Sequence, residues 1–280
     1  MTAAEVRTID TGTETVLAEM IDGVGVITFN RPSRRNALHP EMYDAIPPLL
    51  ERFAADDGIG AVLITGSGTA FCAGGDVRDG GSAKQAAAGD RNAQIRARSV
   101  ILADNARMVT LLHEMPKITI AALPGAAVGA GMSIALSTDL RIASRSARLI
   151  PGWAKLAFSG DFGGAWFLSR LVGPAKALEL LVADQPIDAD AGLALGLFNR
   201  VADDADLPSA ALNWAAEIAA GPTFAFSGTK ANIIDSQSLS LKDALLRESE
   251  RMVASGLTAE HHAAVRTWIE AASAKSATRA

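Results

Sequence analysis

Residues 116–144, PKITIAALPGAAVGAGMSIALSTDLRIAS, carry the pattern on which the fold class depends. Residues 118–122 form a continuous apolar run, which is typical of a strand buried on both faces of a sheet. A turn rich in glycine and alanine follows and leads into a predicted helix within residues 125–136. Residues 140–143 predict a second, shorter strand. The order strand, glycine turn, helix, strand favours an α/β protein with a mostly parallel sheet.

The same pattern occurs closer to the N-terminus. Residues 24–29 (VGVITF) and 61–65 (AVLIT) predict two more buried strands. Between them, the apolar spacing of residues 40–53 predicts a helix. Pro47 and Pro48 lie inside it, and we expect them to kink or split it.

The chain changes character after its first two thirds. From residue 175 onward the pattern predicts only helices, and the acidic run DDAD at 203–206 marks a boundary. At 280 residues the chain is long enough for one large core with a smaller helical part. We therefore expect an α/β core over residues 1–204 for binding and catalysis. Residues 205–280 should form a helical region for oligomerisation and active-site cover.

Composition excludes several classes of protein. The net charge is −5 and the basic residues are scattered, which argues against a nucleic-acid surface. No apolar stretch has the length and character of a membrane span. Cys72 is the only cysteine, and residues 1–14 lack the pattern of a signal peptide. We therefore expect a cytoplasmic protein without an intrachain disulfide.

Two glycine loops follow predicted strands. The loop FCAGGD, residues 71–76, comes after the strand at 61–65, and GAAVGAG, residues 125–131, comes after the strand at 118–122. Open α/β sheets bind ligands at the carboxyl ends of their strands. Two such loops can direct two backbone N–H groups at one oxygen, as in an oxyanion hole. Either loop by itself would be read as a packing device, and neither matches a dinucleotide or P-loop motif.

Four motifs together resemble one known family. They are NRPSRRNAL, TGSGTAFCAGGD, the 116–144 stretch and GDFGGAWFLSRLVG at 160–173, and they occur in the order of the crotonase (enoyl-CoA hydratase/isomerase) superfamily. The resemblance covers about residues 15–205. It implies a spiral of ββα units followed by a helical region. It also implies a homotrimer or a hexamer.

The resemblance implies a reaction on an acyl-CoA thioester. The thioester carbonyl would accept hydrogen bonds from the backbone N–H groups of Gly75 and Ala130, which would stabilise an enolate. Coenzyme A enters as part of the substrate, so neither a separate cofactor nor a metal is expected. Arg34 and Lys230 are candidates for the CoA phosphates, with solvated surface as the alternative. The substrate path would be lined by Ala73, Gly74, Gly75, Asp76, Val77, Gly129, Ala130 and Trp153.

The sequence departs from typical hydratases of the family at the acid and base positions. Two glutamates are usual there, but this chain has Ser133 at one position and Trp153 at the other. Addition of water needs groups that deprotonate water and deliver a proton. Ordinary hydration is therefore not the expected reaction.

Asp161 is the candidate catalytic carboxylate. In several branches of the superfamily an aspartate at this position moves a proton, and in aryl-CoA dehalogenases it attacks as a nucleophile. Trp153 lies eight residues before it, the separation found in the dehalogenases. We expect double-bond isomerisation with Asp161 as acid and base. The alternatives are hydration by Asp161 alone, a dehalogenase-like hydrolysis, an acyl-CoA-binding protein without catalysis, and an Asp161 that only caps a helix.

Overall fold

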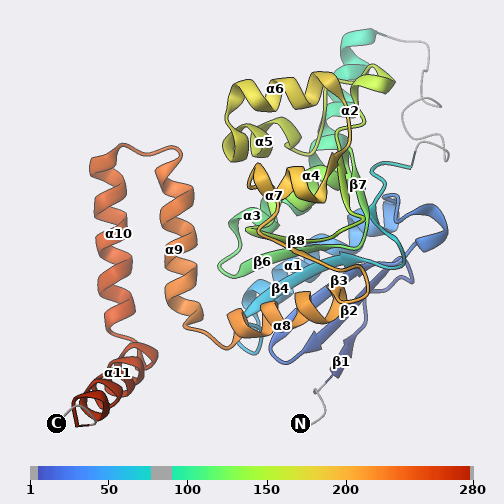
Figure 1. The fold of residues 1–280 in the computed structure, drawn as a ribbon. Helices are drawn as coiled ribbons and strands as arrows, with labels where there is room; N and C mark the ends of the chain where they lie inside the picture. The colour runs from blue at the N-terminus through green and yellow to red at the C-terminus, as the bar shows by residue number, and fades with distance from the viewer. Residues whose placement is uncertain (1–5, 77–89, 278–280) are drawn as a thin grey trace.

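The fold is built from a pair of strands that occurs three times along the chain. The structure is a computed structural model and describes residues 6–76 and 90–277. In each pair the first strand joins a seven-stranded sheet and the second joins a four-stranded sheet. Helices separate the pairs, so the chain winds as the predicted spiral of ββα units (Figure 1). The pairs are β4 (Ala61–Gly66) with β5 (Ala70–Cys72), β6 (Ile118–Leu123) with β7 (Ala126–Val128), and β8 (Leu140–Ser144) with β9 (Arg148–Ile150).

The seven-stranded sheet has the order β1-β2-β3-β4-β6-β8-β11. Its remaining strands are β1 (Val6–Ile9), β2 (Val16–Ile21), β3 (Val24–Phe29) and β11 (Arg200–Ala202). From β3 to β11 all neighbours are parallel, whereas β1 and β2 pair antiparallel at one edge. Parallel strands end on the same side of the sheet. The loops after β4 and β6 therefore leave the sheet side by side.

The inner parallel strands β3, β4 and β6, together with β8, are buried on both faces, as their apolar sequences predict. In β4, Val62 and Ile64 contribute to a larger core, while Leu63 between them contributes to a smaller core on the other face. The larger core also contains apolar side chains of α1 (Pro40–Ala55), α3 (Arg107–Glu114) and α4 (Ala130–Ser137). The smaller core is covered by α8 (Leu207–Ala219), which contributes Leu207, Ala211, Trp214 and Ala215.

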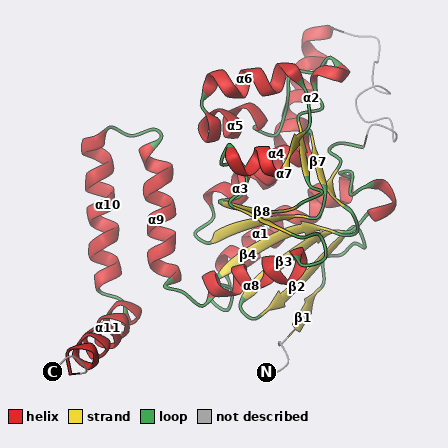
Figure 2. Ribbon diagram, viewed as in Figure 1, coloured by secondary structure: helices red, strands yellow, loops and turns green. Residues whose placement is uncertain are grey.

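The four-stranded sheet has the order β10-β9-β7-β5 and lies beside α4 and α7 (Figure 2). It includes β10 (Ile187–Asp188), which pairs antiparallel with β9. The remaining elements of this part are α2 (Arg91–Asn105), α5 (Gly164–Val172), α6 (Pro174–Ala183), α7 (Ala189–Ala194) and the 3-10 helices η1 (Pro32–Arg34) and η2 (Ala154–Leu156).

Two local predictions are corrected by the structure. Helix α1 continues through Pro47 and Pro48 and is not split. Each proline removes one backbone hydrogen bond, but Ile46, Leu49 and Leu50 on either side are buried in the larger core and hold the helix in place. The region after residue 175 is also not wholly helical, because it contributes the short strands β10 and β11. Strands of two or three residues are too short to give a periodic pattern.

The C-terminal helices extend away from both sheets. The predicted boundary at 204/205 precedes α8, which packs on the seven-stranded sheet, and the extension begins after it with α9 (Thr223–Ser236), α10 (Leu241–Gly256) and α11 (Ala259–Ala277) (Figure 1). This helical arm exposes large apolar side chains, among them Phe224, Leu241, Leu246, Met252, Val253, Leu257 and Trp268. Among the described residues, no helix combines the length and apolar character needed to cross a membrane.

Candidate active site

The two glycine loops meet at the carboxyl ends of β5 and β7, which pair in parallel in the four-stranded sheet. Gly74 has φ +82°, and a Cβ atom there would lie 2.7 Å from the carbonyl oxygen of Val128. A Cβ atom on Gly131 would lie 2.3 Å from the carbonyl oxygen of Cys72. Real Cβ atoms do not approach backbone so closely. The two glycines therefore allow a contact between the loops that no other residue type permits.

The two predicted oxyanion donors lie on these adjoining loops. Ala130 is the first residue of α4, where backbone N–H groups have no intrahelical partner. The space beside Gly75 is open, since no atom lies within 4 Å of the place where its Cβ would be. The Cβ position of Gly74 is 3.5 Å from the nitrogen of Ala130, which measures how near the loops are. This arrangement is compatible with two donors that serve one oxygen.

Asp161 lies beside the second of these loops. Its Oδ1 accepts a hydrogen bond of 3.0 Å from the indole Nε1 of Trp153. Its backbone carbonyl accepts hydrogen bonds from the Ser133 hydroxyl at 3.1 Å and from the Gly164 N–H at 3.0 Å. The indole of Trp153 also lies 3.6 Å from the Cβ position of Gly129. The structure thus brings together Ser133, Trp153 and Asp161, the three positions that the resemblance assigns to acid and base groups.

Asp161 is not the cap of the following helix. Gly163 occupies the N-cap position of α5, and no side chain makes a capping hydrogen bond there. The carboxylate of Asp161 instead faces the indole of Trp153. The alternative that this aspartate only caps a helix is therefore wrong.

The backbone around Asp161 adopts an unusual conformation. Gly160, Phe162 and Gly163 have φ values of +111°, +52° and +76°. A left-handed conformation is rare for a bulky residue such as phenylalanine and costs about 1 to 3 kcal/mol. The Phe162 ring is buried and packs against Tyr43 of α1, with 6.3 Å between the ring centroids. Burial of this ring holds the strained turn and fixes Asp161 within it.

Burial controls the ionisation of this region. It raises the pKa of the Asp161 carboxyl above its ordinary value, and the hydrogen bond from Trp153 opposes that rise. Burial also raises the pKa of the neighbouring Tyr43 to about 12 and that of the Cys72 thiol to about 12. The phenol and the thiol are therefore protonated at neutral pH. Asp161 is the group of the three that can act as a base there.

The positions that lack glutamate have other tasks. The Ser133 hydroxyl donates to the backbone of Asp161, and Trp153 donates to its carboxylate. Both side chains therefore orient the aspartate. Neither can replace a glutamate as an acid or base.

The predicted CoA-binding loop is held by the N-terminal motif NRPSRRNAL. Ala73 donates its N–H to the carbonyl of Arg35 at 3.0 Å, and Leu38 donates its N–H to the carbonyl of Gly74 at 2.8 Å. Asp76 forms an ion pair of 3.2 Å with Arg31. Arg34 is exposed in η1 next to this loop, so a phosphate can approach it. Val77 lies outside the described residues.

Sequence reasoning missed the residue that organises this motif. Asn36 is fully buried with φ +56°. Its side-chain nitrogen donates to the carbonyls of Ser67 and Ala70, and its oxygen accepts the N–H of Arg31. A polar asparagine between two arginines and an alanine would ordinarily be read as a loop residue. Its place within the motif NRPSRRNAL is the one feature of the sequence that could have indicated this role.

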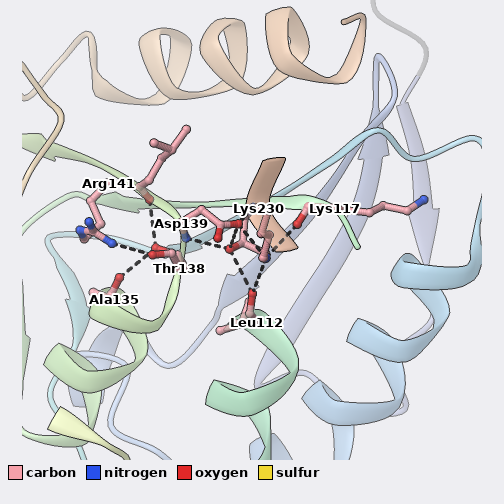
Figure 3. Close-up of polar contacts among 9 residues, drawn as sticks. Leu112, Lys117, Ala135, Thr138, Asp139, Arg141 and Lys230 are labelled. Atoms are coloured by element: carbon pink, nitrogen blue, oxygen red, sulfur yellow. Dashed lines mark hydrogen bonds and ion pairs between the residues drawn. The ribbon is translucent and has the colours of Figure 1, made fainter. Parts of the chain in front are cut away.

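Lys230 is not placed to bind a phosphate. It is 6% exposed, and its ammonium donates to Asp139 Oδ2 at 2.8 Å and to the carbonyls of Leu112 and Lys117 at 3.1 Å each (Figure 3). Asp139 Oδ2 also accepts the N–H and the hydroxyl of Thr119. The predicted CoA contact of Lys230 is corrected accordingly: this lysine fastens α9 to the core.

We expect Lys230→Met to lower the free energy of unfolding by about 2 to 3 kcal/mol, since it leaves the Asp139 carboxylate without its cation. The effect stays below that of a fully buried pair because Asp139 is partly exposed and keeps Thr119. Urea unfolding would measure it, with the exposed Lys242→Met on α10 as the control. Unchanged stability together with weaker acyl-CoA binding would restore the phosphate role.

No cluster of three histidine, cysteine, aspartate or glutamate side chains that could hold a metal ion occurs in the described parts of the chain. His113 contacts the rings of Trp166 and Phe167, and its pKa is lowered, mainly by burial. Its ring contacts are with α5, and among the described residues it makes no hydrogen bond or ring contact with the glycine loops, so it is not a candidate for the site.

Comparison with known proteins decides the family. Residues 19–275 match the family model described as enoyl-CoA hydratase/isomerase. The chain belongs to this family. Within the enoyl-CoA hydratase/isomerase family, members with different reactions are similar to this chain.

A 1,2-epoxyphenylacetyl-CoA isomerase of Escherichia coli is 31% identical over 91% of this chain and 95% of its own length. A 4-chlorobenzoyl coenzyme A dehalogenase of Arthrobacter is 30% identical over 86% of this chain and 85% of its own. A Thermobifida fusca protein solved in complex with CoA has a TM-score of 0.75 and 29% identity, over 87% of this chain and 93% of that one. Membership and the crotonase fold are thus shown, and these members differ in chemistry.

Proposed function

We propose that the protein is an acyl-CoA isomerase that moves a double bond of an enoyl thioester, with Asp161 as acid and base. The observation that supports this most strongly is the arrangement of Asp161. It is a single carboxylate with a raised pKa, oriented by Trp153 and Ser133 beside the loop that carries Ala130. Isomerisation needs one group that takes a proton and returns it. Hydration ordinarily uses two.

The proposed reaction proceeds in two proton transfers. The thioester carbonyl accepts hydrogen bonds from the N–H groups of Gly75 and Ala130. The Asp161 carboxylate removes a proton from the carbon next to the carbonyl or from the carbon beyond the double bond, and the electron pair delocalises into a dienolate. Asp161 then delivers the proton to the other end of the dienolate. Each backbone donor contributes about 3 to 4 kcal/mol to the stability of this intermediate by analogy with other oxyanion holes.

No redox step occurs in this reaction, and we infer that no separate cofactor takes part. Coenzyme A is carried by the substrate. The loop of Ala73, Gly74, Gly75 and Asp76 would line its path together with Gly129 and Trp153, and Arg34 would meet its phosphates. The ion pair of Asp76 with Arg31 would keep this loop in place.

The test is a panel of CoA esters incubated in heavy water and followed by mass spectrometry. An isomerase moves the double bond and incorporates deuterium without a gain of water. Gain of water would instead show a hydratase that uses Asp161 alone. Saturable binding with no turnover of any enoyl, dienoyl or aryl ester would show a binding protein.

A second candidate is hydrolytic dehalogenation of an aryl-CoA. It is favoured by the hydrogen bond from Trp153 to Asp161 and by the similarity to the Arthrobacter dehalogenases. In that reaction the carboxylate oxygen would bond to the ring carbon, halide would leave with the bonding electron pair, and water would hydrolyse the resulting ester. Release of halide from a halogenated aryl-CoA would decide for this candidate.

We expect the protein to bind acyl-CoA at least tenfold more tightly than the corresponding free acid. The thioester supplies both the carbonyl for Gly75 and Ala130 and the CoA group for the loop at 73–76. Isothermal titration calorimetry with a saturated acyl-CoA, which cannot react, would measure the difference. Equal affinity for the thioester and the free acid would contradict the proposed site.

We also expect a homotrimer or a hexamer in solution. The helical arm exposes apolar side chains on all three of its helices, such as Ile233, Leu246 and Trp268, and a second copy would cover part of that surface. Light scattering at micromolar concentration would give the mass. A mass near 29 kDa, that of one chain, would contradict this expectation.

A further inference from the structure

Asp184 is a buried carboxylate far from both glycine loops in the sequence. It is 2% exposed and follows α6 as its C-cap residue, with φ +48°. Its Oδ1 accepts the N–H of Gly152 at 2.5 Å, and its Oδ2 accepts the N–H of Lys155 at 2.9 Å. Both oxygens thus bind one turn of backbone, the turn 152–155.

A charged group is an unusual choice at this place. Helix ends in the left-handed conformation commonly carry glycine or asparagine, and burial of a carboxylate is unfavourable unless hydrogen bonds compensate. Within the described ranges, Asp184 has no ion pair with a lysine or arginine side chain. Its carboxylate is held by the two backbone N–H groups of the turn. The turn 152–155 needs two acceptors, and an aspartate supplies both.

This turn carries Trp153, whose indole lies among glycines. A Cβ atom on Gly164 would lie 2.5 Å from the indole Cη2, and one on Gly129 would lie 3.6 Å from Nε1. The indole therefore fits closely between α5 and the start of α4. From this position Nε1 donates to Asp161 at 3.0 Å. Movement of the turn would move the indole and so displace the N–H group that donates to the Asp161 carboxylate.

We propose that Asp184 is a positioning residue for the Trp153–Asp161 pair. It holds the turn 152–155 at both ends, the turn holds the indole, and the indole orients the Asp161 carboxylate toward the acyl group. The inference rests on the proposed function of Asp161 for its effect on turnover. The geometric part, from Asp184 to the indole N–H, does not depend on which reaction the enzyme performs.

Two substitutions of Asp184 remove one or both of its acceptor oxygens. Asp184→Asn keeps one acceptor oxygen, and Asp184→Gly keeps none but suits the positive φ. We expect kcat to fall about 10-fold in the asparagine variant and about 100-fold in the glycine variant, because a misplacement of about 1 Å costs on the order of 100-fold. KM should stay within about threefold, since neither variant alters the loop at 73–76.

Two further readouts would not respond to a purely structural role. The hydrogen bond from Trp153 lowers the pKa of Asp161 against the effect of burial, so its loss should raise that pKa further. The acid limb of the profile of kcat/KM against pH should then move to higher pH in both variants. The NMR resonance of the Trp153 indole N–H, assigned with Trp153→Phe, should shift in the order wild type, asparagine, glycine.

The matched control is Asp56→Asn. Asp56 is also the C-cap residue of a helix, α1, and also accepts a backbone N–H, that of Gly58 at 2.9 Å. It precedes β4, at the end of the sheet away from the glycine loops. In this variant kcat, the acid limb of kcat/KM and the Trp153 indole resonance should stay as in wild type.

The proposal is overturned if the Asp184 variants keep the wild-type indole resonance and acid limb, whatever their stability. Should the glycine variant not fold, the asparagine variant decides by the same two readouts. A shifted indole resonance combined with full activity of Asp161→Asn would mean that the positioning is present and the proposed role of Asp161 is wrong.

Discussion

Asp161→Asn is expected to lower turnover by about 100- to 10,000-fold and to leave acyl-CoA affinity nearly unchanged. Asparagine has the same shape, and its side-chain oxygen can still accept the indole N–H of Trp153. The substitution therefore removes the base without removing the hydrogen bond that orients it. General acid–base catalysis contributes a factor of this size. Solvent deuterium exchange into a bound enoyl-CoA, compared with wild type, measures the proton transfer itself.

A matched control is available in Asp188→Asn. Asp188 caps α7 and accepts the N–H of Ala191 at 2.9 Å, and asparagine caps a helix nearly as well. This variant should exchange deuterium at the wild-type rate. If Asp161→Asn also did so, Asp161 could not be the base.

The pH dependence of the wild type follows from the same residue. Asp161 must be ionised to take a proton, so activity is lost as the pH falls through its pKa. Burial raises that pKa above the ordinary value of 3.8, and the loss should therefore begin at a higher pH than for an exposed aspartate. The acid limb of kcat/KM measures it.

Gly131→Ala is expected to lower turnover by about 100- to 1,000-fold, the effect of one lost oxyanion donor. The new methyl carbon would lie 2.3 Å from the carbonyl oxygen of Cys72. This oxygen belongs to the backbone, so it cannot move away as a flexible side chain would. Helix α4 must shift to relieve the contact, and the N–H of Ala130 at its start shifts with it. Overpacking of this kind also lowers the free energy of unfolding by about 1 to 3 kcal/mol.

Gly256→Ala is the control for this substitution. Gly256 ends α10, and no atom lies within 4 Å of its Cβ position. Steady-state kinetics and urea unfolding of both variants separate the two effects. Activity of Gly131→Ala within about threefold of wild type would show that the contact between the loops does not position the donor.

Prediction from the sequence was most successful for strands and loops that a short local pattern determines. Residues 118–122 contain no charged side chain and four apolar ones, because β6 is buried on both faces, and this pattern can be recognised within five consecutive residues. The glycine loops are visible for the same reason, since a close backbone approach excludes side chains. Strands β5, β7 and β9 have three residues each and give no periodic signal.

The sequence predicted least where a contact joins distant residues. Lys230 and Asp139 are 91 positions apart, and nothing near Lys230 in the chain indicates that its ammonium is buried. Asp184 is 32 positions from Gly152 and looks like an ordinary residue at a helix end. Asp161 was predicted because its place in the motif at 160–173 is one where several branches of the family have a catalytic aspartate, whereas its hydrogen bond from Trp153 required the structure.

The buried contact of Lys230 also sets an order of assembly. Its ammonium is enclosed by groups from the end of α3, the start of β6 and the turn before β8, so this receptor exists only after β6 and β8 have paired. Helix α9 comes later in the chain and reaches a ribosome exit after those strands. We therefore expect the helical arm to dock on a sheet that has already formed and to be the first part to detach when the protein unfolds.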